Sequence, residues 1–168
     1  MPTKAVEAAI NDQIAKEFFA AHLYLSMSAW LEEQNLPGFA KWMRIQSDEE
    51  RGHAMRLYEY LIDAGGRVRL EGIEAPPVEF KGALAIMEAS LAHEKKVTAS
   101  IRKIYELADK DKDYATQLML QWFITEQLEE EKQAQDVIAR LTMAGDSSAA
   151  LLFIDSQLGS RAPEEEGD

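Results

Sequence analysis

The 168-residue sequence contains no cysteine, only five prolines and nine glycines, and no long apolar run. Without cysteine no disulfide can form, which fits a reducing compartment. No apolar run approaches the ~18–20 residues that a membrane-spanning helix needs. The opening stretch MPTKAVEAAIND also lacks the apolar core of a signal peptide. We therefore expect a soluble protein in the cytoplasm, with no membrane partner.

Basic residues are scarce relative to acidic ones: 18 lysines and arginines stand against 30 aspartates and glutamates, which gives a net charge of −12. Such a surface repels DNA and anionic lipid on average and attracts cations. Nucleic acid is therefore not expected as a partner. Solubility alone is also a sufficient reason for an acidic excess of this size.

Glycine and proline stand at few points, and the stretches between them have the apolar spacing of helices. The expected breaks are Gly65-Gly66 and Pro76-Pro77, and Asp146 is expected to cap the last helix. The pattern predicts helices at about 3–34, 37–64, 80–108, 113–144 and 147–158. We expect residues 1–160 to form one domain and residues 161–168 to form an acidic disordered tail.

The lengths of the links restrict how the four long helices are arranged. The first and third links are only a few residues long, so each joins an antiparallel pair. The second helix is about 42 Å long, and an extended loop over residues 67–79 reaches about 46–50 Å. The third helix can therefore run parallel to the second. The sequence predicts an all-α four-helix bundle with one long crossover and a short fifth helix.

Each long helix carries an apolar stripe with steps of three and four residues, and polar side chains interrupt every stripe near its middle. The interrupting residues are Glu17, Glu50, His53, Glu94, Gln127 and Glu130. Helices of similar length bring their midpoints to one level. We therefore expect four carboxylates, one imidazole and one amide to meet in a single layer of the core.

Buried carboxylates cost several kcal/mol each unless they are paired, and no lysine or arginine occupies the stripes at that level. A multivalent metal neutralises them best, and oxygen ligands with one imidazole suit iron or manganese, with zinc a less distinctive fit. Glu50 and His53 lie three residues apart on one helix face, and Glu50 could bridge two ions. Such Glu-x-x-His pairs also occur by chance on solvated faces.

The chain closely resembles the prokaryotic non-haem ferritins in two stretches, LYLSMSAWLEEQNLPGFAKWMRIQSDEERGHAMRLYEYL and QWFITEQLEEEKQAQDVI. Ferritin-like di-iron bundles carry glutamates and Glu-x-x-His motifs that project into the core, and the polar residues of the stripes match this pattern. The resemblance implies that Glu17, Glu50 and His53 bind a first iron. It implies further that Glu50 bridges to a second iron held by Glu94 and Glu130.

The resemblance also assigns residues around this di-iron centre. Gln127 would be a hydrogen-bonding neighbour, and Tyr24 matches a tyrosine beside the irons, either as a redox group or as a core aromatic bonded to a ligand carboxylate. A third, weaker iron site is implied at Glu49, Glu126 and Glu129. Of the other histidines, we expect His22 on the surface and His93 beside the centre or in solvent.

Several positions depart from related families. The stretch EQLEEEKQ has no histidine, and Arg51 stands where bacterioferritins carry the haem-binding methionine, so no haem is expected. Gln117 and Leu120 replace the acidic lining of the threefold pore of animal ferritins. A path for iron through the subunit therefore becomes the favoured route to the site.

The short helix at 147–158 is apolar nearly all round. We expect the four-helix core to have no free face for it, and an exposed apolar patch of this kind marks an interface. The alternative is a helix folded back on its own bundle. In ferritins this helix lies at the fourfold axis of a hollow homo-oligomeric cage of two dozen subunits. The resemblance thus implies a ferroxidase that oxidises Fe(II) with O₂ or H₂O₂ and stores the ferric mineral. Three alternatives remain: a rubrerythrin-like di-iron peroxidase or oxidase without storage, a non-catalytic helical interaction protein, and, less favoured, a DNA-protecting mini-ferritin.

Overall fold

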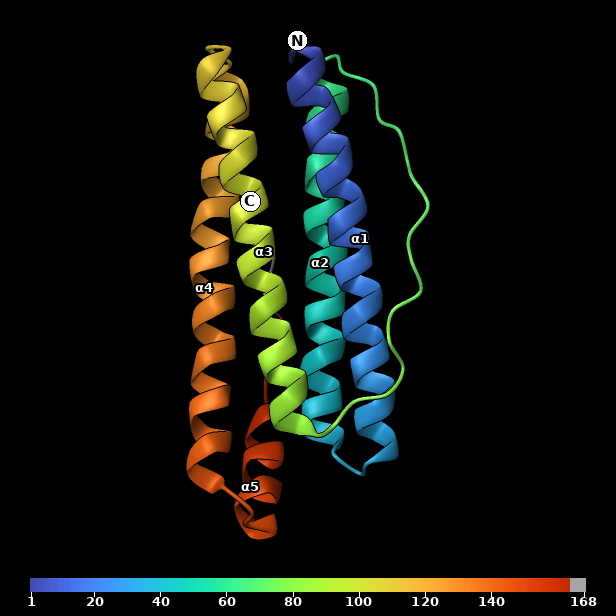
Figure 1. Cartoon of the computed structure of the whole chain (residues 1–168), viewed down its shortest axis with the longest axis vertical. Coiled ribbons are helices and arrows are strands. Elements are labelled where there is room, and N and C mark those ends of the chain that lie inside the picture. Colours follow the sequence, from blue (N-terminus) through green and yellow to red (C-terminus); the bar gives the residue numbers. More distant parts are fainter. Residues whose placement is uncertain (164–168) are drawn as a thin grey trace.

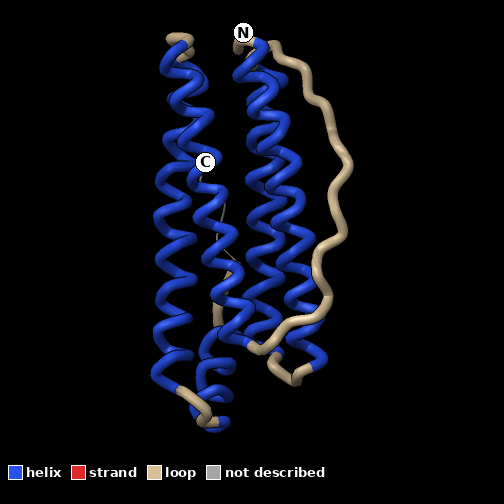
Figure 2. The backbone as a smooth tube through the Cα atoms, in the orientation of Figure 1, coloured by secondary structure: helices blue, strands red, loops and turns tan. Residues whose placement is uncertain are grey.

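The computed structural model describes residues 1–163, and in that range it contains five α-helices and no strand. Four long helices stand side by side, and the short fifth helix lies at one end of them (Figures 1 and 2). The helices are α1 (Lys4–Glu33), α2 (Pro37–Asp63), α3 (Ala83–Lys110), α4 (Tyr114–Ala144) and α5 (Ser148–Gly159). The predicted all-α bundle is confirmed. Within residues 1–163, none of the helices combines the length and apolar character needed to span a bilayer.

The helix boundaries agree with the prediction except at two starts. We expected the third helix to begin at residue 80, but α3 begins at Ala83 because Gly82 has a φ of 138°, which is incompatible with a helix. We expected Asp146 to cap the last helix, but Ser147 does so: its side chain accepts a hydrogen bond of 3.2 Å from the amide of Ala150.

Residues 64–82 form the predicted crossover, which runs along the outside of α1 from one end of the bundle to the other (Figure 1). Asn11 of α1 fixes the start of this loop, because its amide donates to the Arg67 carbonyl at 2.9 Å and accepts from the Arg69 amide at 2.6 Å. Further along, Ser26 donates to the Pro77 carbonyl at 2.6 Å. The crossover makes α3 parallel to α2, as the loop length predicted.

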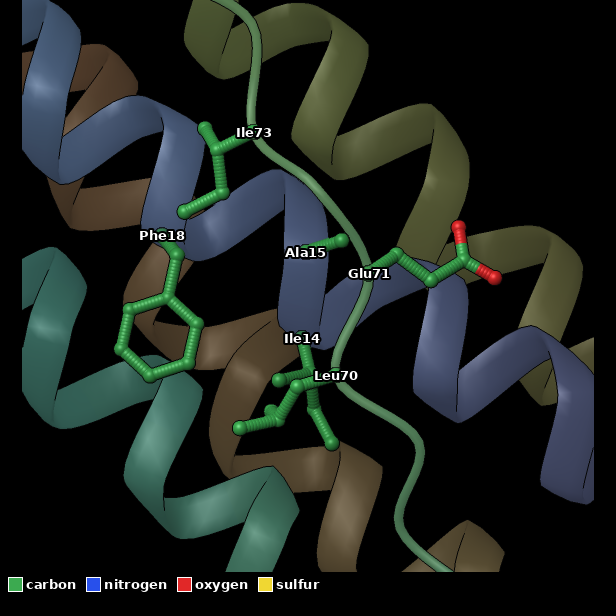
Figure 3. Close-up of a pocket in the computed structure, with 6 residues that line it drawn as sticks. All are labelled: Ile14, Ala15, Phe18, Leu70, Glu71 and Ile73. Atoms are coloured by element: carbon green, nitrogen blue, oxygen red, sulfur yellow. The ribbon is translucent and has the colours of Figure 1, made fainter.

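The crossover also covers an apolar part of α1. Leu70 and Ile73 of the loop face α1 across a small pocket (Figure 3). The α1 side of this pocket is lined by Ile14, Ala15 and Phe18. Apolar contact therefore adds to the hydrogen bonds that α1 side chains make with the loop backbone.

A belt of polar residues divides the buried core into two apolar clusters. One cluster includes Tyr24, Phe39, Met43 and Met87, and the other includes residues such as Ile10, Ile14, Leu57, Ile101 and Phe123. In every long helix the polar residues, apart from Gln13, lie between the parts of the chain that supply the two clusters. The main members of this belt are Gln13, Glu17, Gln46, Glu50, His53, Ser90, Glu94, Gln127 and Glu130.

The short helix α5 packs against the bundle at the end where α2 begins (Figure 1). Ile154 and Leu158 are buried in this contact. The expectation that the bundle has no free face for the fifth helix is therefore wrong. The reason is a close backbone approach at Gly38, where a Cβ atom would lie 1.7 Å from the Asp155 carbonyl oxygen. Leu152 and Phe153 remain 58% and 64% exposed on the other side of α5.

Candidate metal centre

All four long helices contribute buried polar side chains to the middle of the bundle. Glu17 comes from α1, Glu50 and His53 from α2, Glu94 from α3, and Gln127 and Glu130 from α4; each is at most 4% exposed. The heptad-like spacing that turns apolar residues inward at both ends of each helix turns these residues inward at mid-height. The structure thus brings the predicted layer into the core.

Three of these side chains form a compact set of ligand atoms. Glu17, Glu50 and His53 each offer one atom, and these atoms lie within 4.8 Å of one another. One oxygen of Glu17 accepts a 2.8 Å hydrogen bond from Gln13. The other oxygen of Glu17, both oxygens of Glu50 and Nδ1 of His53 have no hydrogen-bond partner, although His53 Nδ1 lies 3.4 Å from Glu50 Oε2. Buried polar atoms left in this state are rare and costly, and a cation among them would satisfy all four.

A second set shares the same histidine. His53, Glu126 and Glu130 also offer ligand atoms within 4.8 Å of one another, and His53 Nε2 lies 4.0 Å from Glu126. Gln46 donates to Glu130 Oε2 at 2.6 Å. The ring of His53 is held edge-on by Trp122, with ring centroids 5.4 Å apart. His53 is thus placed between two groups of carboxylates, one on each side of the imidazole.

Glu94 belongs to the same layer but is already hydrogen-bonded. Tyr24 Oη donates a short hydrogen bond to Glu94 Oε1, and Gln127 Nε2 donates to Glu94 Oε2 at 3.0 Å. Ser90 in turn donates to Tyr24 Oη at 3.4 Å. The hydroxyl-to-carboxylate bond expected for Tyr24 and the hydrogen-bonding position expected for Gln127 are both present. Glu94 is not among the two compact sets of ligand atoms found within residues 1–163.

Burial shifts the pKa values of the side chains in this layer, and repulsion between the carboxylates adds to the shifts of the acids. Burial raises the pKa of Glu17 to about 7, and it raises the pKa values of Glu50 and Glu130 well above the usual range, with the charge of Glu94 adding to the effect. Burial, followed by the charge of Arg56, lowers the pKa of His53 to about 4. At neutral pH the imidazole is therefore neutral and able to bind a metal, while the carboxyls resist ionising together.

The donor set fits a hard, multivalent cation. Carboxylate oxygens dominate, one neutral imidazole takes part, and no thiolate exists in the chain. Such a set suits iron or manganese. A bound cation would also reverse the pKa shifts, because its charge favours the ionised carboxylates.

Of the three residues predicted for a third metal site, only one belongs to a compact set of ligand atoms among the described residues. Glu126 joins the set around His53. Glu49 is instead paired with Arg161, whose Nη2 lies 3.0 Å from both carboxylate oxygens. Glu129 is exposed on α4 and accepts a 3.4 Å hydrogen bond from Gln133.

Arg161, the first residue of the stretch expected to form a disordered tail, lies against α2. It contacts Glu49 and Gln46 of α2, and its side chain is only 15% exposed. The prediction relied on the acidic composition that follows, and composition carries no information about one arginine reaching back to the bundle. Residues 164–168 of the expected tail lie outside the described residues.

Sequence reasoning missed the amides around the centre. Gln13 and Gln46 each precede a core glutamate by one helical turn, Glu17 and Glu50 respectively, and this spacing could have indicated them. His22 is exposed, as expected. His93 packs beside Phe19 and Tyr24, with ring centroids 6.1 and 6.0 Å away.

A four-helix bundle with an acid-rich layer of ligand atoms at mid-height defines a class of helical metal-binding proteins. Residues 7–144 match the family described as Ferritin, the ferritin-like domain, and this chain belongs to that family. The resemblance noted in the sequence is thereby confirmed.

The relatives match over nearly the whole chain. The bacterial non-heme ferritin of Staphylococcus aureus (strain USA300) is 39% identical over 166 residues, which cover 99% of this chain and 100% of the relative. The protein of the same description from Staphylococcus epidermidis is 40% identical over 162 residues, covering 96% and 98%. Among solved structures, the open pore ferritin of Archaeoglobus fulgidus matches with a TM-score of 0.95 at 40% identity, covering 96% of this chain and 100% of that chain.

Proposed function

We propose that this chain is the subunit of an iron-storage ferritin, and that its core centre oxidises Fe(II) with O₂ or H₂O₂. The observation that carries the proposal is the state of Glu50: the side chain is fully buried, and both of its oxygens lack a hydrogen-bond partner. Such a carboxylate, with two oxygens that make no hydrogen bond, is suited to bridge two cations. The acidic net charge of −12 supports attraction of Fe(II) to the molecule.

In the proposed arrangement, Glu17, Glu50 and His53 bind the first Fe(II). Glu50 bridges to a second Fe(II), which Glu94 and Glu130 bind. The compactness of the first ligand set and the unpaired oxygens within it support this assignment. At the second position, a metal ion would compete with the hydrogen bonds that Tyr24 and Gln127 donate to Glu94. The metal would then neutralise the charge of this carboxylate, and Gln127 and Tyr24 would orient it.

The chemistry of the pair follows from electron balance. Each Fe(II) gives one electron, so two irons, one O₂ and two protons yield two Fe(III) and one H₂O₂. Carboxylates favour Fe(III), the harder and more highly charged ion, and so they favour the oxidised product. His53, neutral because burial lowers its pKa to about 4, needs no deprotonation before it binds. Glu17, with a pKa of about 7, releases part of a proton when iron binds.

Storage requires an enclosed space, and we propose a homo-oligomeric cage of two dozen subunits. The apolar side chains Leu152 and Phe153 of α5 are more than half exposed, as are Leu70 and Val78 of the crossover. Apolar residues in these two places are suited to contacts between copies. We place residues 1–160 in one domain per subunit, and the assembly in the cytoplasm without haem.

The proposal is tested by substituting Glu50→Ala and measuring aerobic Fe(II) oxidation from the absorbance of the ferric product. We expect loss of the rapid phase with an intact assembly on size-exclusion chromatography. Glu88→Gln is the matched control, because Glu88 is an exposed acid on α3 and its substitution should leave the rate unchanged. A wild-type rate in the Glu50 variant would refute the ligand assignment.

The same preparation separates the alternatives. A particle of several hundred kilodaltons that retains ferric mineral supports storage. A small oligomer that oxidises Fe(II) without retaining mineral points to a rubrerythrin-like oxidase. A protein that neither binds nor oxidises Fe(II) would be a helical interaction protein with unusual core acids.

A further inference from the structure

After α5 the chain turns back to α2, and Arg161 docks there. Its Nη2 contacts both oxygens of Glu49 at 3.0 Å, and the two side chains are only 15% and 16% exposed. The guanidinium also lies over the ring of Trp42, 5.0 Å from the centroid. An arginine held by a carboxylate and an aromatic face is a fixed, permanently charged group.

This arginine is connected to the core through a single amide. Arg161 Nη1 donates to the side-chain oxygen of Gln46, and the nitrogen of the same amide donates to Glu130 Oε2 at 2.6 Å. Because the oxygen of Gln46 is engaged by Arg161, its nitrogen faces Glu130. The end of the described chain is thus joined by hydrogen bonds to a carboxylate of the metal centre.

Glu49 and Glu126 both lie close enough to Glu130 to affect its protonation. Burial and then the charge of Glu94 raise the pKa of Glu130, and the charges of Glu49 and Glu126 add to this rise. Glu126 and Glu130 also offer ligand atoms within 4.8 Å of His53. A positive charge at this place therefore lowers the repulsion between carboxylates on the outer side of the centre.

We propose that Arg161 is a built-in counter-cation of the outer acid Glu49, so that a metal ion binds this carboxylate only by displacing the guanidinium. The inference rests on the proposed function, since it concerns the third iron position that the sequence resemblance implies at Glu49, Glu126 and Glu129, next to the di-iron centre. Glu49 is occupied on both oxygens while Arg161 is in place. The third position is therefore closed in the metal-free protein, and it fills last and most weakly.

The test is anaerobic calorimetric titration of the full-length assembly with Fe(II), so that binding is measured without oxidation. We expect Arg161→Ala to tighten the weakest class of sites by about tenfold or more, the scale of a close charge pair. Arg161→Lys retains the charge but loses the two-pronged contact, and it should give a smaller gain. Arg44→Ala is the matched control, because Arg44 lies on α2 in an exposed pair with Glu32.

A double variant tests whether any gain in affinity comes from the carboxylate of Glu49. If the gain arises from freeing this carboxylate, Glu49→Gln combined with Arg161→Ala should show no gain over Glu49→Gln alone. An unchanged or weaker third class in Arg161→Ala overturns the inference, and so does an equal gain in Arg44→Ala, which would reflect net charge alone. Should Arg161→Ala fail to assemble, an absence of gain in Arg161→Lys overturns the inference.

The two proposals fail in different ways. A wild-type assembly that binds no Fe(II) refutes the proposed function. If two Fe(II) bind tightly per subunit and the affinity of the third class of sites does not change when Arg161 is substituted, only the role of this arginine is refuted.

Discussion

The backbone amide of Phe39 donates a 2.9 Å hydrogen bond to the side chain of Asp155, so a residue of α5 caps the first turn of α2. This helix needs the cap, because Leu36 at its N-terminal boundary supplies no side-chain hydrogen bond. A carboxylate at this position satisfies an amide that has no partner within the helix and interacts favourably with the helix dipole. Docking of α5 and formation of the start of α2 are therefore coupled.

Substituting Gly38→Ala should detach α5, because the new Cβ atom would lie 1.7 Å from the Asp155 carbonyl. We expect a loss of about 1–3 kcal/mol in the free energy of unfolding, and a smaller particle by size-exclusion chromatography with light scattering. Gly72→Ala is the control, since no atom lies within 4 Å of its Cβ position. A Gly38→Ala variant with wild-type stability and size would show that the close approach is not required.

Metal-free protein should lose stability as the pH rises from 6.5 to 8.5. The folded state raises the pKa of Glu17 from 4.5 to about 7, so it binds this proton more tightly than the unfolded chain does. This contribution is fully present below pH 4.5 and is lost as the pH rises through 7; of the total of about 3 kcal/mol, about 1 kcal/mol is lost above pH 6.5. Glu50 and Glu130, whose pKa values are raised further, extend the loss above pH 7.

The buried His53 and the half-buried His93 act in the opposite direction at lower pH. Burial lowers the pKa values of His53 and His93 from 6.5 to about 4, so their contribution is present above pH 6.5 and is lost as the pH falls toward 4. Urea unfolding in the presence of chelator, between pH 6.5 and 8.5, therefore isolates the acids. Glu50→Gln should flatten the decline and Glu88→Gln should retain it. Stability that increases with pH in this window would contradict the shifts.

Zinc(II), which is not oxidised, should stabilise the protein by occupying the unpaired atoms of Glu17, Glu50 and His53. At a free concentration of about 100 times the dissociation constant, a single site adds about 2.7 kcal/mol to the free energy of unfolding. Thermal unfolding with and without zinc measures the effect, and chelator should reverse it. If Glu50→Ala keeps the full stabilisation, zinc is bound elsewhere.

Tyr24→Phe should weaken binding at the second iron position while sparing the first. The substitution removes the hydroxyl that donates to Glu94, a proposed second-site ligand, and leaves Gln127 as the remaining side-chain donor. We expect the second class of sites to bind about tenfold or more weakly in anaerobic Fe(II) titration, in keeping with the ~1.5–3 kcal/mol of a hydrogen bond to a charged group. Tyr60→Phe is the control, because it loses a hydroxyl bonded to Thr116, away from the layer. Equal weakening of both classes would argue against this division of roles.

Helical periodicity accounts for the part of the fold and centre that the sequence predicts. Glu17, Glu50 and Glu130 occupy positions that face inward whatever the neighbouring helices do, so their burial follows from spacing alone. Contacts between distant segments do not follow from spacing. The pairing of Glu49 with Arg161 depends on how the chain leaves α5, and no local pattern encodes that path.

The helix starts illustrate the same division at smaller scale. The start of α3 depends on the single backbone angle of Gly82, whereas its middle is fixed by many apolar contacts. The docking of α5 was missed because it depends on the absence of a side chain at Gly38. An absence of atoms at one residue is difficult to distinguish, in a sequence, from an ordinary helix-start glycine.

The crossover at 64–82 leaves each antiparallel helix pair continuous in the sequence, and the ligand sets divide between the pairs. Glu17, Glu50 and His53 all come from α1 and α2, whereas His53, Glu126 and Glu130 join α2 to α4. The first set can form within one hairpin, but the second exists only when the hairpins meet. A chain cleaved at Gly72 should therefore behave as two fragments that associate more tightly when metal is present, because the cation would bind ligands from both fragments.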